Sequence, residues 1–263
     1  MTIRNIFILD NKKIKGLDKE KERIERLLKR CGKDVQKTPE KADLIITMGG
    51  DGTFLKGVHL IKDSRTLIYG IKYGNVGFLA NSAEDVDSKL KKVVKGDFKA
   101  YRRMLLDVTV KKRDGGGAVK DFCLNEVVFF RKGIRIINVS VSSKKEPVFS
   151  DIRTDGLIVS TPVGSTAHSL AASGPVISPC MECMLVVPVN PHSISWRPAI
   201  LPSDEKIEVR VSPGASLAAD GQREFELGEG DVVTVKKSAR TVRMIMEDGS
   251  FFGKLTSKFN WGK

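Results

Sequence analysis

The chain has 263 residues, of which 41% are hydrophobic and 29% are charged, so it can form one large globular domain or two ordinary ones with a substantial core. It contains no apolar run long enough to span a membrane and no recognisable secretory leader, so we expect a cytoplasmic protein that does not act in a membrane. The formal net charge of +13 favours anionic partners, but no aromatic residues are interleaved with the basic ones, which argues against nucleic acid.

The first hundred residues alternate between short apolar runs and amphipathic segments with helical spacing. Strands are predicted at residues 3–9, 42–48 and 65–71, and helices at 18–31, 53–61 and 85–94. Such alternation is typical of a parallel sheet with helices on both faces. We therefore predict an α/β domain with a parallel sheet over residues 1–100.

After residue 100 the pattern changes to alternating apolar and polar residues separated by turns. Extended segments are predicted at 104–111, 118–124, 134–141, 157–160, 207–211, 232–236 and 241–246, with a glycine-rich turn at 114–117. Segment 166–172 is a helical exception. We therefore predict an all-β, sandwich-like domain over residues 101–240 and expect residues 241–263 to return to the N-terminal domain.

The segment Gly49-Gly50-Asp51-Gly52-Thr53 joins a predicted strand to a predicted helix. Glycines at such a junction let backbone N–H groups approach an oxyanion, and the helix N-terminus favours negative charge. The segment lacks the Gly-Lys-Ser/Thr ending of a Walker A loop and does not fit a dinucleotide fingerprint. A structural alternative is a tight turn in which Asp51 or Thr53 caps the helix.

A second unusual segment, residues 155–169, is rich in Gly, Ser, Thr and Asp and follows about a hundred residues later. Together the two segments could bind one polyanionic ligand. An alternative is a hydrolase triad of Ser165, His168 and Asp155. The Gly-x-Ser-x-Gly elbow is missing, however, and Ser165 and His168 are too close in sequence for the usual triad arrangement.

Gly-Gly-Asp-Gly-Thr resembles the signature of a kinase superfamily that includes NAD kinases, diacylglycerol and sphingosine kinases, and phosphofructokinases. Four later segments are similar to NAD kinases in particular: residues 74–79 (Gly-Asn-Val-Gly-Phe-Leu), Asn125-Glu126, 155–169 and 191–198. The resemblance extends from about residue 42 to residue 222. It implies transfer of the γ-phosphoryl group of ATP to the 2′-hydroxyl of the adenosine ribose of NAD.

The resemblance also implies roles for individual residues. Asp51 is the expected proton acceptor. Asp51 and Gly52 are both expected to contact NAD. The expected phosphate-donor loop consists of Gly49, Gly50, Gly52 and Thr53. The further expected NAD contacts are Phe78, Asn125, Glu126, Arg153, Asp155, Thr166, Ala167, His168, Ser169, Leu170, Ala171 and Gln222.

Five positions have features of their own. Strand alternation would place Arg153 and Asp155 on one face, where they could act together. His168 stands where the family usually has tyrosine, and Lys72 stands where it generally has asparagine. Lys56, one helical turn after the glycine loop, could reach a phosphate of the ligand or be merely structural.

The expected substrates are NAD and a nucleoside triphosphate, or polyphosphate, and the expected cofactor is a divalent cation, most simply Mg²⁺, bound with the triphosphate. A homodimer or homotetramer is usual for such families. A lipid kinase with the same glycine loop and a catalytically silent NAD-binding module are the alternatives. Cys180 and Cys183 have metal-ligand spacing, but no second such pair exists, and free thiols are the simpler interpretation.

Overall fold

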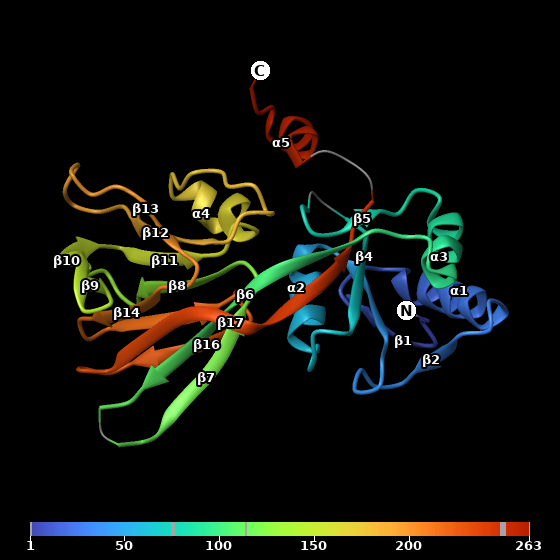
Figure 1. Ribbon diagram of the computed structural model, residues 1–263, viewed down its shortest axis with the longest axis horizontal. Helices are drawn as coiled ribbons and strands as arrows, with labels where there is room; N and C mark the ends of the chain where they lie inside the picture. Colours follow the sequence, from blue (N-terminus) through green and yellow to red (C-terminus); the bar gives the residue numbers. More distant parts are fainter. Residues whose placement is uncertain (1, 75–76, 114, 248–250, 263) are drawn as a thin grey trace. The chain divides into compact units, whose positions relative to one another are not determined.

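The computed structural model describes residues 2–74, 77–113, 115–247 and 251–262, and the chain divides into two compact units (Figure 1). The first unit comprises residues 1–102 and 241–263, and the second comprises residues 103–240.

The first unit contains a parallel sheet. Its strands are β1 (Asn5–Asp10), β2 (Asp34–Gln36), β3 (Leu44–Gly49), β4 (Leu67–Lys72) and β5 (Asn81–Ser82), and its order is β2-β1-β3-β4, with β5 beside β4. The end of β17 (Val232–Ile245) also pairs in parallel with β4, through Arg243 and Met244. The prediction of a parallel sheet in an α/β domain is therefore confirmed.

Helices pack on both faces of this sheet. The helices of the unit are α1 (Leu17–Arg30), α2 (Asp51–His59), α3 (Val86–Lys95) and α5 (Phe251–Phe259). Every residue of β3 is buried. Leu44 and Ile46 belong to the apolar cluster that includes α1 and α3, whereas Thr47 faces α2, where a Cβ atom at Gly57 would lie 2.4 Å from its Cγ2. The continuous apolar run of β3 is thus explained by burial on both sides.

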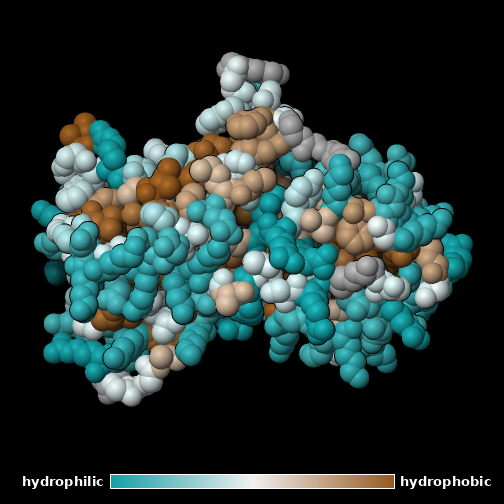
Figure 2. All heavy atoms as spheres, viewed as in Figure 1, coloured by the Kyte–Doolittle hydropathy of each residue, from teal (hydrophilic) through white to brown (hydrophobic). Residues whose placement is uncertain are grey.

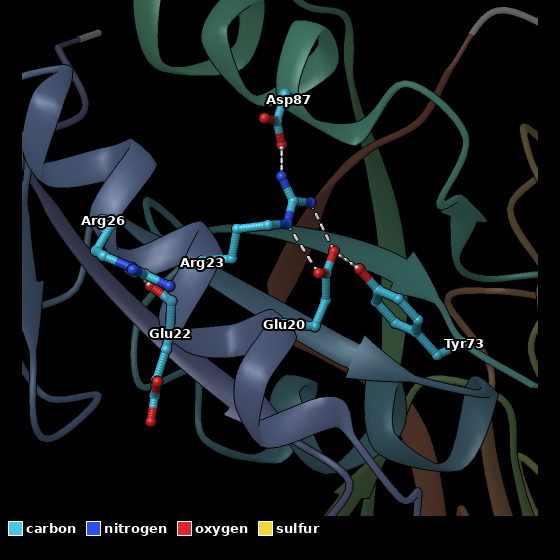
Figure 3. A network of polar contacts seen from close by, with 6 residues as sticks. All are labelled: Glu20, Glu22, Arg23, Arg26, Tyr73 and Asp87. Atoms are coloured by element: carbon cyan, nitrogen blue, oxygen red, sulfur yellow. Dashed lines mark hydrogen bonds and ion pairs between the residues drawn. The ribbon is translucent and has the colours of Figure 1, made fainter.

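A polar network joins α1 to α3 and to the end of β4 (Figure 3). The Arg23 guanidinium donates to Glu20, with Nη2 2.6 Å from Oε1, and also forms an ion pair with Asp87 of α3. The hydroxyl of Tyr73 donates to the same carboxylate of Glu20 at 2.9 Å. The hydrogen bond from Arg23 is the main reason that the pKa of Glu20 is lowered, and burial raises the pKa of Tyr73.

The second unit is a sandwich of antiparallel sheets. One sheet has the order β10 (Glu146–Thr154), β9 (Ile137–Ser143), β14 (Lys206–Val211), β17, β6 (Ala100–Lys111) and β7 (Ala118–Cys123). The other has the order β13 (Ala199–Pro202), β12 (Cys183–Val189), β11 (Gly156–Ser160), β8 (Glu126–Arg131), β15 (Ala215–Ala219) and β16 (Arg223–Leu227). Alternate residues of both sheets, such as Val141, Val209, Phe129 and Leu157, form one buried cluster. The sandwich-like prediction is confirmed.

Several boundaries differ from the sequence predictions. Segments 232–236 and 241–246, expected as two strands, are the two ends of the single strand β17, because the polar residues between them interrupt the apolar pattern without interrupting the backbone pairing. The expected helix at 166–172 is a 3₁₀ turn, η1 (Gly164–Thr166), followed by the short helix α4 (His168–Ala171). Across the residues that the structure describes, no helix combines the length and apolarity needed to cross a membrane.

Candidate functional site

The glycine loop of the first unit, residues 49–53, spans the end of β3 and the start of α2, with Gly50 between them. Gly49 has φ +154°, and a Cβ atom there would lie 2.4 Å from Oγ1 of Thr53, so a larger residue would displace the start of α2. A Cβ atom at Gly50 or Gly52 would meet no atom within 4 Å. Gly49 is therefore required by the fold of the loop, whereas Gly50 and Gly52 leave space beside it for a ligand.

The Asp51 carboxylate accepts two backbone hydrogen bonds. The N–H of Phe78 lies 2.7 Å from Oδ2, and the N–H of Leu79 lies 3.0 Å from Oδ1. A Cβ atom at Gly77 would lie only 2.3 Å from Oδ1, so this approach requires glycine. Among the described residues no side chain caps α2, so the capping interpretation of Asp51 and Thr53 is wrong. Asn75 and Val76 of the sequence motif lie outside the described residues.

The two other candidates in this unit differ in their surroundings. Lys56 is exposed on α2. The half-buried ring of Phe78 stacks on Phe259 of α5 with a centroid distance of 5.1 Å, and the Nζ atom of Lys258 lies 4.7 Å from its centre. The family resemblance implied an NAD contact for Phe78 but gave no indication of this contact with α5.

In the second unit, Asp220 fixes the backbone of the Asn125-Glu126 pair. Its carboxylate accepts hydrogen bonds from the N–H groups of Leu124 at 2.8 Å, Asn125 at 2.7 Å and Glu126 at 3.3 Å. On the other side, the N–H of Thr161 donates to the Asn125 carbonyl at 2.9 Å. Asp220 was not among the predicted site residues, because three bonds to a distant strand end leave no trace in local sequence.

Segment 161–164 approaches the same strand end closely. The Thr161 hydroxyl donates to the Leu124 carbonyl at 2.6 Å. A Cβ atom at Gly164 would lie 2.2 Å from the Asn125 carbonyl oxygen, so glycine is needed at this contact. The Asn125-Glu126 pair and the segment leading to α4 therefore form one local structure.

Three buried polar atoms of this local structure have no hydrogen-bond partner within the described part of the chain: Asn125 Oδ1, Glu126 Oε2 and Ser169 Oγ. Burial of such atoms is unfavourable unless a ligand or water satisfies them. Burial, reinforced by the negative charge of Asp220, raises the pKa of Glu126 to about 8. A protonated carboxyl group can donate one hydrogen bond and accept others, which suits a ligand with hydroxyl groups.

Arg153 and Asp155 do not share a strand face. β10 ends at Thr154, and Asp155 lies at the bend before β11. Hydrogen bonds from Asn190 Nδ2 at 3.1 Å and from Arg131 Nε at 2.7 Å lower the pKa of Asp155. Arg131, which the sequence analysis missed, is therefore the cation beside Asp155, and Arg153 is exposed on β10.

The remaining candidates of the second unit lie on η1, on α4 and after β15. Ser169 is buried and His168 and Ala171 are exposed, while the half-buried residues are Thr166, Ala167, Leu170 and Gln222. The amide of Gln222 donates to the Asp220 carbonyl at 3.1 Å. Ser165 is fully buried and its hydroxyl is bonded to the Pro162 carbonyl at 2.7 Å, so it is unsuited to a hydrolase triad.

No group of three or more His, Cys, Asp or Glu side chains suited to a metal ion occurs in the described ranges. Cys180 and Cys183 are free thiols, as are Cys31 and Cys123.

The first unit carries a carboxylate on a glycine loop, and the second carries buried polar atoms without a partner among the described residues, features that suit a phosphorylated ligand with hydroxyl groups. Residues 8–98 match the model of the ATP-NAD kinase N-terminal domain, and residues 124–246 match that of the ATP-NAD kinase C-terminal domain. The chain belongs to the NAD kinase family.

Relatives and solved structures agree with this assignment. An NAD kinase of Aquifex aeolicus is 35% identical over 257 residues, covering 91% of this chain and 93% of its own. One from Symbiobacterium thermophilum is 38% identical over 227 residues, covering 84% and 79%. The structure of an NAD kinase from Archaeoglobus fulgidus in complex with ATP has a TM-score of 0.81 at 30% identity, covering 96% of this chain and 99% of that one. The structure of yeast NADH kinase complexed with NADH shares the fold, with a TM-score of 0.91 at 21% identity, covering 100% and 89%.

Proposed function

We propose that this protein is an NAD kinase, which phosphorylates the 2′-hydroxyl of the adenosine ribose of NAD with ATP to give NADP. The observation that carries the proposal is the match to both domains of the family, together with relatives named NAD kinase that are about 35% identical over most of the chain. The Asp51 carboxylate on its glycine loop supplies the chemical group that the reaction needs.

In the proposed reaction, the ribose 2′-oxygen forms a bond to the γ-phosphorus of ATP while the bond to the β-phosphate oxygen breaks and ADP leaves. The hydroxyl proton passes to Asp51. Each oxygen of the Asp51 carboxylate accepts one backbone hydrogen bond and keeps a second lone pair for this proton. The two backbone bonds hold the carboxylate in one orientation, and such positioning is the main demand of phosphoryl transfer.

The proposed contacts to NAD come largely from the second unit. Asn125, Glu126 and Ser169 offer the unsatisfied buried atoms, which would bind ribose hydroxyls or an exocyclic amine. Asp155 provides a second acidic contact and Arg153 a cation for the diphosphate. Residues 166–171 and Gln222 complete the proposed site.

The donor is proposed to be ATP, as in the complex of the Archaeoglobus fulgidus relative. Mg²⁺ would enter with the triphosphate as part of the substrate, because it prefers phosphate oxygens and water to an all-protein site. Gly50, Gly52 and Thr53 would approach the donor phosphates. The cytoplasmic location and the homodimer or homotetramer stay predictions, the latter testable by light scattering.

A panel of acceptors and donors tests the proposal. Purified protein is incubated with Mg²⁺ and either ATP or polyphosphate, and with NAD, NADH or diacylglycerol dispersed in detergent. We expect phosphorylation of NAD, detected enzymatically as NADP. Phosphorylation of the lipid alone would favour a lipid kinase, and NAD binding without NADP formation with any donor would favour a silent binding module.

A further inference from the structure

A pocket of about 450 Å³ in the first unit is lined by residues from the end of β4, from the segment around β5 and from α5. Three lysines line it: Lys72, Lys254 and Lys258. Lys72 is the residue that departs from the asparagine usual in the family. A pocket of this size is typical of a small-molecule site.

The acids of the same pocket offset the charges of the three lysines only in part. Within the described residues none of them forms an ion pair, whereas Glu247 pairs with Lys89 at 3.0 Å and accepts the Tyr69 hydroxyl at 3.2 Å. The other acid of the lining, Glu84, is exposed.

Contacts of α5 direct two of the lysines toward the Asp51 loop. Lys254 and Lys258 are four residues apart in α5 and therefore share a face of the helix. The ammonium group of Lys258 lies over the ring of Phe78, whose backbone N–H donates to Asp51. The Asp51 carboxylate acts electrostatically on both lysines of α5. The pocket therefore adjoins the carboxylate to which the proposed function assigns proton transfer.

The charges in the pocket are energetically unfavourable without a partner. Burial lowers the pKa of Lys254 and of Lys258, and the positive charges of Lys72 and Lys254 lower the pKa of Lys258 further. The carboxylates of Glu247 and Asp51 act in the opposite direction and raise the pKa of Lys254, and the Asp51 carboxylate raises that of Lys258. A ligand with several negative charges would relieve the remaining repulsion.

We propose that Lys72, Lys254 and Lys258 bind the phosphate chain of the phosphoryl donor. The inference rests on the proposed function and names the group that holds the donor beside the glycine loop. A linear phosphate chain is common to nucleoside triphosphates and inorganic polyphosphate. Lysine suits such a chain because its ammonium group binds phosphate oxygens without a fixed geometry.

The test compares the wild-type protein with Lys72→Met, Lys254→Met and Lys258→Met. Lys258→Arg keeps the charge and the cation–π contact with Phe78, and Lys91→Met, at an exposed position of α3, is the matched control. Binding of inorganic tripolyphosphate is measured by calorimetry, and KM is measured for ATP and for polyphosphate with NAD as acceptor. NAD affinity is measured separately.

We expect each methionine variant to weaken tripolyphosphate binding and to raise the donor KM by about tenfold, the effect of losing one charge-assisted hydrogen bond. The NAD affinity of each methionine variant should stay close to that of the wild type. Lys91→Met should match the wild type in all measurements, and Lys258→Arg should retain more tripolyphosphate binding than Lys258→Met. A KM rise with both donors assigns the pocket to the phosphate chain itself, and a rise with ATP alone assigns it to a nucleoside triphosphate.

Unchanged tripolyphosphate binding and donor KM in all three methionine variants would overturn the inference while leaving NADP formation, and with it the proposed function, intact. Conversely, tripolyphosphate binding that the three substitutions weaken, in a protein that forms no NADP, would support the pocket and refute the proposed function. A loss of NAD affinity equal to the loss of donor affinity would also overturn the inference.

Discussion

Glu126 and Asp220 place two carboxyl groups near one buried strand end. The Asp220 carboxylate accepts hydrogen bonds from three backbone N–H groups. These bonds fix the strand end from which Asn125 and Glu126 project. The Oε2 atom of Glu126 receives no hydrogen bond from the described residues, and the negative charge of Asp220 acts on the Glu126 carboxyl group. The two acids therefore have different tasks: Asp220 orders the backbone, and Glu126 presents a neutral carboxyl group near pH 7.

The raised pKa of Glu126 predicts a pH-dependent stability. Because its pKa is about 8 in the folded protein and 4.5 ordinarily, the folded state holds a proton that the unfolded state releases between these values. This contribution to stability is present below pH 4.5 and is lost as the pH rises to about 8, at up to about 1.4 kcal/mol for each pH unit. Glu126→Gln should flatten this decline and be more stable than wild type at pH 8.

Urea denaturation at intervals from pH 5 to pH 8.5 measures the effect. Glu224→Gln is the matched control, because Glu224 is exposed on β16 of the same unit. A decline with pH that is equally steep in Glu126→Gln and wild type would contradict the assignment.

Much of the candidate site could be predicted from the residue types of short sequence motifs. Gly49 to Thr53 and Asn125-Glu126 were found from the sequence because each combines unusual residues at a strand end. The partners Asp220 and Arg131 were missed, and Gly77 was recognised only as part of a motif, since each acts on a residue 24 to 96 positions away. No local pattern records such a contact.

At the scale of elements, the α1–α3 contact depends on Arg23 as well as on apolar packing. Its guanidinium joins Glu20 in its own helix to Asp87 in α3 (Figure 3). The Arg23–Asp87 ion pair is partly exposed, so solvent screens it and its contribution to the free energy of unfolding is modest.

Arg23→Met should lower the free energy of unfolding by about 0.5–1 kcal/mol, and 0.5 M NaCl should reduce the difference because salt screens exposed ion pairs. The matched control is Arg26→Met, since Arg26 donates to the Glu22 carbonyl of its own helix at 3.3 Å. Guanidinium would mask the ion pairs, so urea is the denaturant of choice. Equal effects of the two substitutions would show that Arg23 acts by packing alone.

The helices and strands of the first unit were largely predictable, because burial of one helix face and of entire strands produces strong periodicity. The second unit was harder. Strands β8, β10, β12, β13, β15 and β16 were not predicted. β17 was predicted as two strands, because a polar stretch hides a continuous strand whose pairing is set by its neighbours. Edge pairing and strand order depend on contacts that local sequence does not encode.

At the scale of the whole molecule, the basic surface and the proposed substrates are complementary in charge. Hydrophilic residues cover much of the face seen in Figure 2, and hydrophobic ones gather over the β12–β13 part of the second unit. A net charge of +13 raises the local concentration of polyanions such as ATP and NAD, with an effect that weakens as salt increases. The charge thus suits the proposed substrates without defining the fold.

The most direct test of the account compares turnover with NAD binding in Asp51→Asn. The amide keeps an oxygen that can accept a backbone hydrogen bond but cannot take the ribose proton, so kcat should fall by at least about a hundredfold. The Kd for NAD, measured by calorimetry, should change by less than about threefold, because the proposed contacts of the second unit remain. Turnover that survives the substitution, or turnover and NAD affinity that fall by the same factor, would contradict the role of Asp51 as proton acceptor.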